Sequence, residues 1–336
     1  RQRQMCIRDR DKSMLKLSIA EAKTRAEAVL VANDTAPENA ASVANALVLA
    51  EADGLAGHGL MRLPFYAAQA KCGKIDGQAR PAVKQRTGSG VSLDAANGFA
   101  YPAIDMAIDE LLALTFRQGV AAASITRSSH CGAMGLVVER LASHGLVALM
   151  FANTPAAMAV WGGRRPLLGT NPIACAFPRP RGAPVVIDLS LSKVARGQIV
   201  AARQKGTKIP NDWALDAQGQ ETEDPEAALA GSMLPLGGAK GAALALMVEA
   251  LAAGLTGSHY AYEASSFLDA QGPPPGTGQL LIALNPISFG GNISHMERLF
   301  AEALTDGVRL PGARRSENRR RAEAEGLVVQ EGWFAA

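Results

Sequence analysis

Hydrophobic positions along the chain follow two different spacings. In some segments apolar residues recur every three or four positions, as on one face of a helix, and in others they form short runs of strand length. The helix-like segments are residues 18–33, 35–54, 63–73, 101–119, 133–145, 193–206, 241–257 and the region after 295. The strand-like segments are residues 91–94, 120–126, 146–153, 183–190 and 279–286. This mixture predicts an α/β protein of the mixed α+β type.

The longest apolar run, residues 241–257, is too short to cross a bilayer comfortably and contains Glu249. We therefore predict a buried helix, the most buried one of the protein, and no membrane association. Residues 208–231 are polar and rich in turn formers, which predicts a surface excursion. Residues 262–278 contain three consecutive prolines, which predicts a loop.

Composition narrows the class of protein. With 336 residues and 48% hydrophobic residues, the chain can form one large or two smaller folded domains. A net charge of +3 gives no reason to expect a nucleic-acid partner, and we read the basic run 314–321 as a solvated helix. The four scattered cysteines form no CxxC pair, so we expect a reducing, cytoplasmic location and no metal site. Residues 1–13 are charged and aperiodic, and we interpret them as a non-native leader.

The stretch LAGHGLMRLP, residues 55–64, places His58 between two glycines and Arg62 four positions later. Residues four apart share a face of a helix, so a helix over 58–62 would direct both side chains at one small molecule. Histidine exchanges a proton near neutral pH, and arginine binds carboxylates through paired hydrogen bonds. Such a pair is nevertheless more often a solvated helix face than a site.

General nucleotide-binding motifs are absent. No GxGxxG follows a strand, no GxSxG is present, and GGAKGA at 237–242 does not fit the phosphate-loop pattern. Two segments nonetheless suit an anion at the start of a helix, namely RSSHCGAMG at 127–135 and the segment around Lys240.

Seven stretches occur in an order that resembles one known family. They are HGLMRLP, SSHCGAMG, GGRRPLLGTNPIA, IDLSLSKVARGQ, IPNDWALDAQGQETEDP, LPLGGAKGAALALMVE and TGQLLIALNP. Over roughly residues 15–315 the chain resembles the malate/L-lactate dehydrogenase-like oxidoreductases, which are unrelated to the Rossmann-type lactate and malate dehydrogenases. The family includes sulfolactate and ureidoglycolate dehydrogenases and reductases of Δ1-pyrroline-2-carboxylate and Δ1-piperideine-2-carboxylate.

The resemblance implies a non-Rossmann fold with a largely antiparallel cofactor-binding sheet and a helical domain formed by both chain ends. We expect residues 14–118 with 294–336 on the substrate side and residues 119–293 as the NAD(P)-binding domain. The implied partners are a small-molecule substrate, a second copy in a homodimer, and NAD or NADP as cofactor, with NADPH favoured.

The resemblance also implies roles for individual residues. His58 matches the proton donor, Arg62 the arginine that binds the substrate carboxylate, and Thr170 a substrate contact. Arg196, or Lys193 beside it, is placed to hold a second anionic group of the substrate. Arg314 or Arg315 lies where the family approaches the adenosine end of the cofactor and is a candidate for the 2′-phosphate of NADP. The implied cofactor-binding residues are His130, Cys131, Gly132, Ala133, Met134, Asp188, Leu189, Ser190, Ala239, Lys240 and Arg314.

Two positions depart from the family pattern. Gly57 stands where many members carry a serine beside the histidine, and Gln198 stands where some imino-acid reductases carry an aspartate. Three functions therefore stay open: a 2-hydroxyacid dehydrogenase, a cyclic imino-acid reductase, and a nucleotide-binding protein without turnover. In each of them, what orients His58 is an open question.

Overall fold

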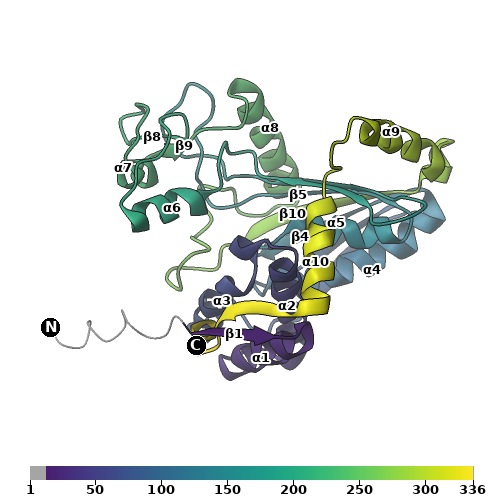
Figure 1. Ribbon diagram of the computed structural model, residues 1–336, viewed down its shortest axis with the longest axis horizontal. Helices are drawn as coiled ribbons and strands as arrows, with labels where there is room; N and C mark the ends of the chain where they lie inside the picture. The colour runs from purple at the N-terminus through teal and green to yellow at the C-terminus, as the bar shows by residue number, and fades with distance from the viewer. Residues whose placement is uncertain (1–12, 336) are drawn as a thin grey trace.

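The computed structural model describes residues 13–335, and a seven-stranded sheet forms its largest part (Figure 1). All neighbouring strands run antiparallel except β3 and β4, which are parallel. The strand order is β2 (Ala82–Arg86), β3 (Gly90–Asp94), β4 (Val120–Ser128), β10 (Thr277–Leu284), β5 (Val147–Ala152), β6 (Ile173–Phe177) and β7 (Val185–Leu189). The predicted mixed α/β class and largely antiparallel sheet are confirmed.

Helices α4 (Ala100–Gln118) and α5 (Met134–Ser143) cover one face of this sheet (Figure 1). Strand β10 lies at its centre, where Leu281 pairs with Ala123 of β4 and with Met150 of β5. The apolar stripe of α4 packs on these strands, which explains why its sequence is amphipathic. The helix ends at Gly119, whose φ of 83° suits a residue without a side chain.

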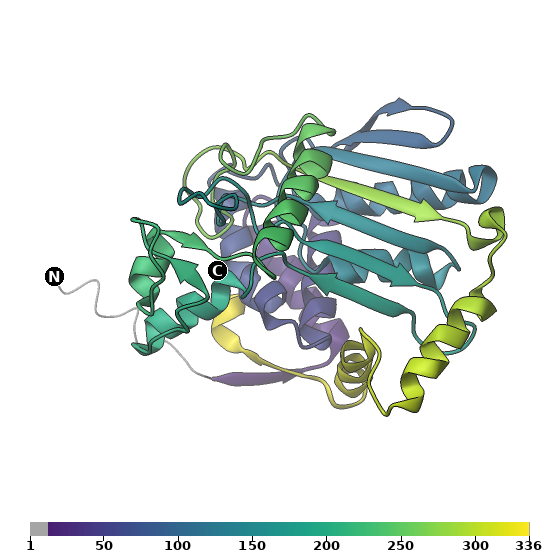
Figure 2. The same ribbon diagram turned by 90° about the horizontal axis from the view of Figure 1, so that it is seen from above.

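Helix α8 (Ala239–Glu249) lies on the opposite face and continues into the π-helical turn η3 (Ala250–Gly254). In Figure 2 it is the green helix that crosses the sheet. The side that carries Ala245 and Val248 is buried against the sheet, but Leu244 and Met247 on the other side are exposed. The prediction that residues 241–257 form the most buried helix was therefore wrong, because only one of its two apolar sides is covered within the described chain.

A helical unit packs beside the sheet and contains both ends of the described chain (Figure 1). Two short strands, β1 (Met14–Leu17) and β11 (Leu327–Gln330), pair antiparallel and close it. Arg319, in the last long helix of the chain, forms ion pairs with the buried Asp53 and with Glu139 of α5. The helices of this unit are α1 (Ile19–Ala32), α2 (Pro37–Ala52), α3 (Leu63–Lys71) and α10 (Ala313–Glu325).

Residues 208–231 form more than a surface excursion. They contain strand β8 (Ala214–Leu215) and helix α7 (Pro225–Ala230), and β9 (Ser232–Met233) follows directly and pairs with β8. Together with α6 (Arg196–Lys205) they form a small lobe whose core includes Met158 and Ile199 (Figure 1). Outside this lobe, α9 (Ile293–Thr305) packs near the end of β7 through Phe300 and Val185.

The division into a domain of residues 14–118 with 294–336 and a domain of 119–293 stays a prediction. Strands β2 and β3 and helix α4 belong to the first of these parts by sequence and pack on the sheet of the second. The interpretation of residues 1–13 as a leader falls, except for Ser13, outside the described residues. Within the described residues, no helix is long and apolar enough to span a bilayer.

Candidate active site

His58 and Arg62 lie in two short 3-10 turns rather than in one helix. The turns are η1 (Ala56–His58) and η2 (Leu60–Arg62), and Gly59 between them is extended. A side chain at Gly59 would collide with Glu51 of α2, whose carboxylate accepts a hydrogen bond of 2.9 Å from the Leu60 N–H. The condition of a continuous helix over 58–62 is therefore not met, but close packing on α2 still brings the two side chains to one site.

Both side chains present a buried polar atom without a hydrogen-bond partner among the described residues. In Arg62, Nε donates to the Gly57 carbonyl over 2.8 Å, while Nη1 is unpaired. In His58, the unpaired atom is Nδ1. Buried polar groups are nearly always hydrogen-bonded, so this arrangement fits a polar ligand, and the guanidinium selects an anionic one.

The protonation of His58 follows from the same surroundings. Burial, and then the positive charge of Arg62, lower its pKa from 6.5 to about 4. His58 is therefore neutral at pH 7 and ready to accept a proton. An anion bound to Arg62 would offset the second cause and raise the pKa, so that a carboxylate ligand favours the protonated, acid-donating form.

His130 is the third member of this cluster. Its ring stacks on His58, with 5.4 Å between the centroids and 11° between the planes. The Tyr66 hydroxyl lies 2.5 Å from His130 Nδ1 and 3.0 Å from the Tyr101 hydroxyl, and the Phe267 ring lies against His130 at 5.2 Å. Neither tyrosine was identified from the sequence, although the four-residue spacing from Arg62 to Tyr66 was a usable signal.

The predicted cofactor segment, residues 130–134, lies between the end of β4 and the first residue of α5. Cys131, Ala133 and Met134 are buried, and Gly132 has a φ of 69°. At the end of β7, Asp188 accepts a hydrogen bond of 2.7 Å from the Gly135 N–H in the first turn of α5. The structure thus brings two of the predicted cofactor segments, 130–134 and 188–190, together. Burial raises the pKa of Asp188.

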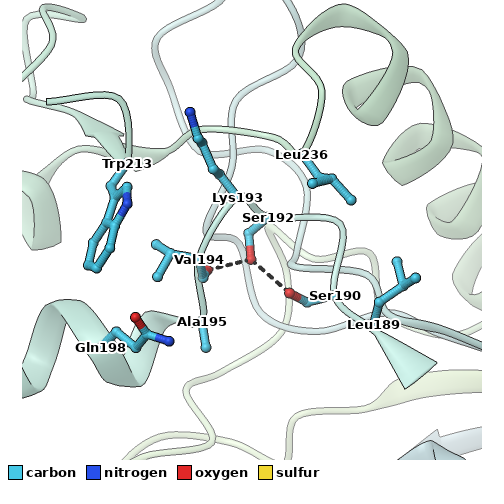
Figure 3. Close-up of a pocket in the computed structure, with 9 residues that line it drawn as sticks. All are labelled: Leu189, Ser190, Ser192, Lys193, Val194, Ala195, Gln198, Trp213 and Leu236. Carbon is cyan, nitrogen blue, oxygen red and sulfur yellow. Dashed lines mark hydrogen bonds between the residues drawn. The ribbon is translucent and has the colours of Figure 1, made fainter. Parts of the chain in front are cut away.

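A cavity of about 390 Å³ lies next to this junction (Figure 3). Leu189 and Ser190, both predicted to bind cofactor, line it together with the indole of Trp213. Lys193 is held by an ion pair with Asp212. The remaining lining residues are Ser192, Val194, Ala195, Gln198 and Leu236. A flat apolar wall beside serine hydroxyls fits an aromatic ring with polar substituents, so the residues present suit a nicotinamide cofactor.

Thr170 is joined to the cavity segment through its backbone, since its carbonyl accepts a hydrogen bond of 2.8 Å from the Leu191 N–H. Its own N–H donates to Thr154 Oγ1 over 2.9 Å. The next residue, Asn171, donates over 2.7 Å to Glu249, which is buried in α8. This network fixes the position of Thr170 relative to the lining of the cavity.

The predicted basic residues differ in their surroundings. Arg196, at the start of α6, has no ion-pair partner among residues 13–335, and burial lowers its pKa.

Ala239 and Lys240 are exposed at the start of α8. The N–H of the neighbouring Leu236 donates a hydrogen bond of 2.8 Å to the Leu191 carbonyl. Arg314 is exposed, whereas Arg315 lies 3.5 Å from Asp188. The structure therefore brings Arg315, and not Arg314, to the predicted cofactor segments.

Comparison with known proteins supports a common family. A family model described as malate/L-lactate dehydrogenase matches residues 17–336. The chain is 52% identical over 308 residues to (2R)-3-sulfolactate dehydrogenase (NADP(+)) of Chromohalobacter salexigens, covering 90% of this chain and 92% of that protein. It is 39% identical over 327 residues to Δ1-pyrroline-2-carboxylate reductase of Ancylobacter novellus, covering 96% of both chains.

Among solved structures, Δ1-piperideine-2-carboxylate reductase of Pseudomonas syringae superposes with a TM-score of 0.90 at 37% identity. The superposition covers 96% of this chain and 98% of that one. The similarity therefore extends over the sheet, the helical unit and the small lobe together.

Proposed function

Because the chain belongs to the malate/L-lactate dehydrogenase family of NAD(P)-dependent oxidoreductases, we propose that it interconverts a small 2-hydroxy acid with its 2-oxo acid. The preferred pair is 3-sulfolactate and 3-sulfopyruvate, with NADP(H) as cofactor. The observation that carries this proposal is the 52% identity to a sulfolactate dehydrogenase, against 39% to a pyrroline-2-carboxylate reductase.

The residues of the His58 cluster suit this reaction. The free guanidinium edge of Arg62 would hold the carboxylate, which fixes the face that the substrate presents. His58 would donate a proton to the oxo oxygen during reduction and take it back from the hydroxyl during oxidation. A bound nicotinamide supplies or accepts the hydride. The segments 130–134 and 188–190, with Ala239 and Lys240, are the proposed cofactor-binding residues.

A sulfonate adds a second anionic group, which needs a second cation. Lys193 is already neutralised by Asp212, whereas Arg196 is partly buried without an acidic partner among the described residues. We therefore assign the sulfonate to Arg196 and keep Thr170 as a further substrate contact. Arg196→Gln should raise KM for 3-sulfopyruvate at least tenfold, estimated from about 1.5–3 kcal/mol for a hydrogen bond to a charged group, and leave KM for pyruvate unchanged. Equal effects on both substrates would contradict the assignment.

The second candidate is a cyclic imino-acid reductase, which several relatives and the superposed structure favour. Such substrates carry one carboxylate, so Arg62 alone would suffice for them. A panel of 3-sulfopyruvate, oxaloacetate, pyruvate and Δ1-pyrroline-2-carboxylate, each with NADPH and NADH, separates the two readings. The proposal expects the highest kcat/KM with 3-sulfopyruvate and NADPH. Faster turnover of the cyclic imine would replace it with the second candidate, and cofactor binding without any turnover would indicate a protein that has lost catalysis.

For the preference between NADPH and NADH, the proposed residues are Arg314 and Arg315. Arg315 faces Asp188, so it can offset the negative charge that would otherwise repel a phosphate, and the exposed Arg314 is free to contact one. Arg314→Ala and Arg315→Ala should each lower the ratio of kcat/KM for NADPH to kcat/KM for NADH. An unchanged ratio in both variants would remove this part of the proposal.

A homodimer is proposed from the uncovered side of α8. Leu244, Leu246 and Met247 are between 41% and 53% exposed there, and no charged side chain interrupts them. An apolar stripe of this kind is normally covered, and a second copy of the chain is the proposed partner. Light scattering should give twice the 35.0 kDa of one chain. Leu244→Glu should yield monomers, while Val31→Glu, at an exposed apolar position on α1, should not. A cytoplasmic location remains part of the proposal.

A further inference from the structure

The orientation of His58 raises a question that its own hydrogen bonds do not answer. Gly57 offers no side chain, and Nδ1 of His58 has no partner among the described residues. The ring nevertheless lies nearly parallel to the ring of His130, at 11° and 5.4 Å. The His130 ring lies along the face of His58, so the groups that hold His130 bear on the orientation of His58.

His130 is held by a chain of two tyrosines from two helices. Tyr101 of α4 contacts the Tyr66 hydroxyl of α3 over 3.0 Å, and Tyr66 contacts Nδ1 of His130 over 2.5 Å. Both tyrosines are buried, and burial raises the pKa of Tyr66 to about 12, so both hydroxyls keep their protons. Each hydroxyl thus has one proton to donate.

Counting donors fixes the direction of this chain. If Tyr101 donates to Tyr66 and Tyr66 donates to Nδ1, both buried hydroxyl protons have an acceptor, and only the Nε2–H of the half-buried His130 is left for solvent or a ligand. If Nδ1–H donated instead, Tyr66 would donate to Tyr101, and the Tyr101 proton would have no acceptor among the described residues. A buried donor without an acceptor costs about 1–3 kcal/mol. The first direction is therefore favoured, and it places the His130 proton on Nε2.

The residues that pack around Tyr101 and His130 leave room for these hydrogen bonds. A side chain at Gly132 would lie 2.6 Å from the Tyr101 hydroxyl, so only glycine leaves room for it. The Phe267 ring also lies against His130, and the backbone of Phe267 is held by a hydrogen bond of 3.1 Å from Gln69 of α3 to its carbonyl. His130 thus has one hydrogen bond at Nδ1, ring contacts with His58 and Phe267, and an Nε2 without a partner among the described residues.

We propose that Tyr101 and Tyr66 are positioning residues, which hold His130 as the neutral Nε2–H tautomer and thereby fix the plane of His58. His130 also presents its Nε2–H as a donor to a ligand oxygen. The titratable and charged groups that face His130 are His58, Arg62 and Tyr66, with Tyr101 behind Tyr66. Burial and the charge of Arg62 lower the pKa of His130, in agreement with a neutral ring. The effect on turnover rests on the proposed function, whereas the tautomer does not.

Nitrogen-15 spectra of the histidine side chains test the tautomer in the free protein without any substrate. The chain has five histidines, so His130 can be assigned by its substitution. The wild-type protein should show His130 protonated at Nε2 and neutral at pH 7, since burial and the charge of Arg62 lower its pKa. Tyr66→Phe removes the donor to Nδ1, so the tautomers should mix and the pKa of His130 should rise. An Nδ1–H tautomer in the wild type, or an unchanged spectrum in Tyr66→Phe, would overturn the proposal.

Kinetics give the second readout and rank three variants. Tyr66→Phe should lower kcat/KM about threefold to tenfold, from about 0.5–1.5 kcal/mol for one hydrogen bond, through kcat rather than through KM for NADPH. Tyr101→Phe leaves the bond from Tyr66 to Nδ1 intact and should have a smaller effect. Tyr262→Phe, at an exposed tyrosine, is the control and should have none. Equal effects of Tyr66→Phe and Tyr262→Phe would contradict a positioning role, whereas an inactive wild type would instead contradict the proposed function.

Discussion

Replacing Arg62 by glutamine removes a carboxylate clamp and a positive charge next to His58 in one step. Truncating one partner of a buried, hydrogen-bonded charge pair costs about 2–5 kcal/mol. At about 1.4 kcal/mol per factor of ten, kcat/KM for the oxo acid should fall between roughly 30-fold and several thousand-fold. Steady-state NADPH oxidation measures this loss. The matched control is Arg117→Gln, because Arg117 is exposed at the end of α4 and has no ion pair among the described residues.

The same variant should move the pH profile. Oxidation of the hydroxy acid needs neutral His58. The kcat/KM of oxidation should therefore decline as the pH falls through the pKa of His58 in the free protein, which is about 4. Arg62 is the second cause of the low pKa after burial, so Arg62→Gln should shift this acid limb to higher pH without restoring the full 6.5. Arg62→Lys keeps the positive charge, so the decline of kcat/KM at acid pH should stay at the wild-type position. If Arg62→Gln lowers kcat/KM less than threefold, Arg62 does not bind the carboxylate. If the acid decline of kcat/KM does not shift, Arg62 does not lower the pKa of His58.

Three further substitutions test the surroundings of the site. Gly132→Ala forces a side chain at φ 69° into the Tyr101 hydroxyl, so activity and thermal stability should both fall, and a structure with Tyr101 unmoved would count against this. Arg319→Met leaves the buried Asp53 unpaired and should lower the free energy of unfolding in urea by about 3–5 kcal/mol; a loss below 1 kcal/mol would show that the pair is unimportant. Gly57→Ser meets no atom within 4 Å, so it should fold normally and change kcat less than threefold, and a large gain would show that a serine is needed to orient His58.

Elements with strong periodicity were predictable from the sequence, and elements defined by partners were not. The helices over 18–33 and 101–119 follow from their apolar spacing, and their packing confirms it. Strands β1 and β6 were missed, because β1 is short and β6 lies within a glycine- and proline-rich stretch without alternation. Their pairing with β11, and with β5 and β7, stabilises them, and such long-range contacts leave no local signal.

For the site, the sequence identified single residues but not how they meet. His58 and Arg62 were found by motif, yet they lie in two short turns separated by Gly59 and not on one helix. Tyr66 and Tyr101 meet only because α3 packs near α4, so no sequence spacing relates them. The exposed side of α8 was read as core because its composition does not show whether the covering surface belongs to the same chain.

We propose that His58 exchanges the proton of a hydride-transfer reaction, and that the site binds NADP(H) without help from His58. The most direct test is His58→Ala, measured for NADPH affinity by fluorescence titration and for turnover with NADPH and 3-sulfopyruvate. His58→Ala should lower kcat at least a hundredfold, as expected for removal of a general acid, and should change NADPH affinity less than threefold. A His58→Ala variant with the wild-type kcat would contradict the role of His58 as the residue that exchanges the proton.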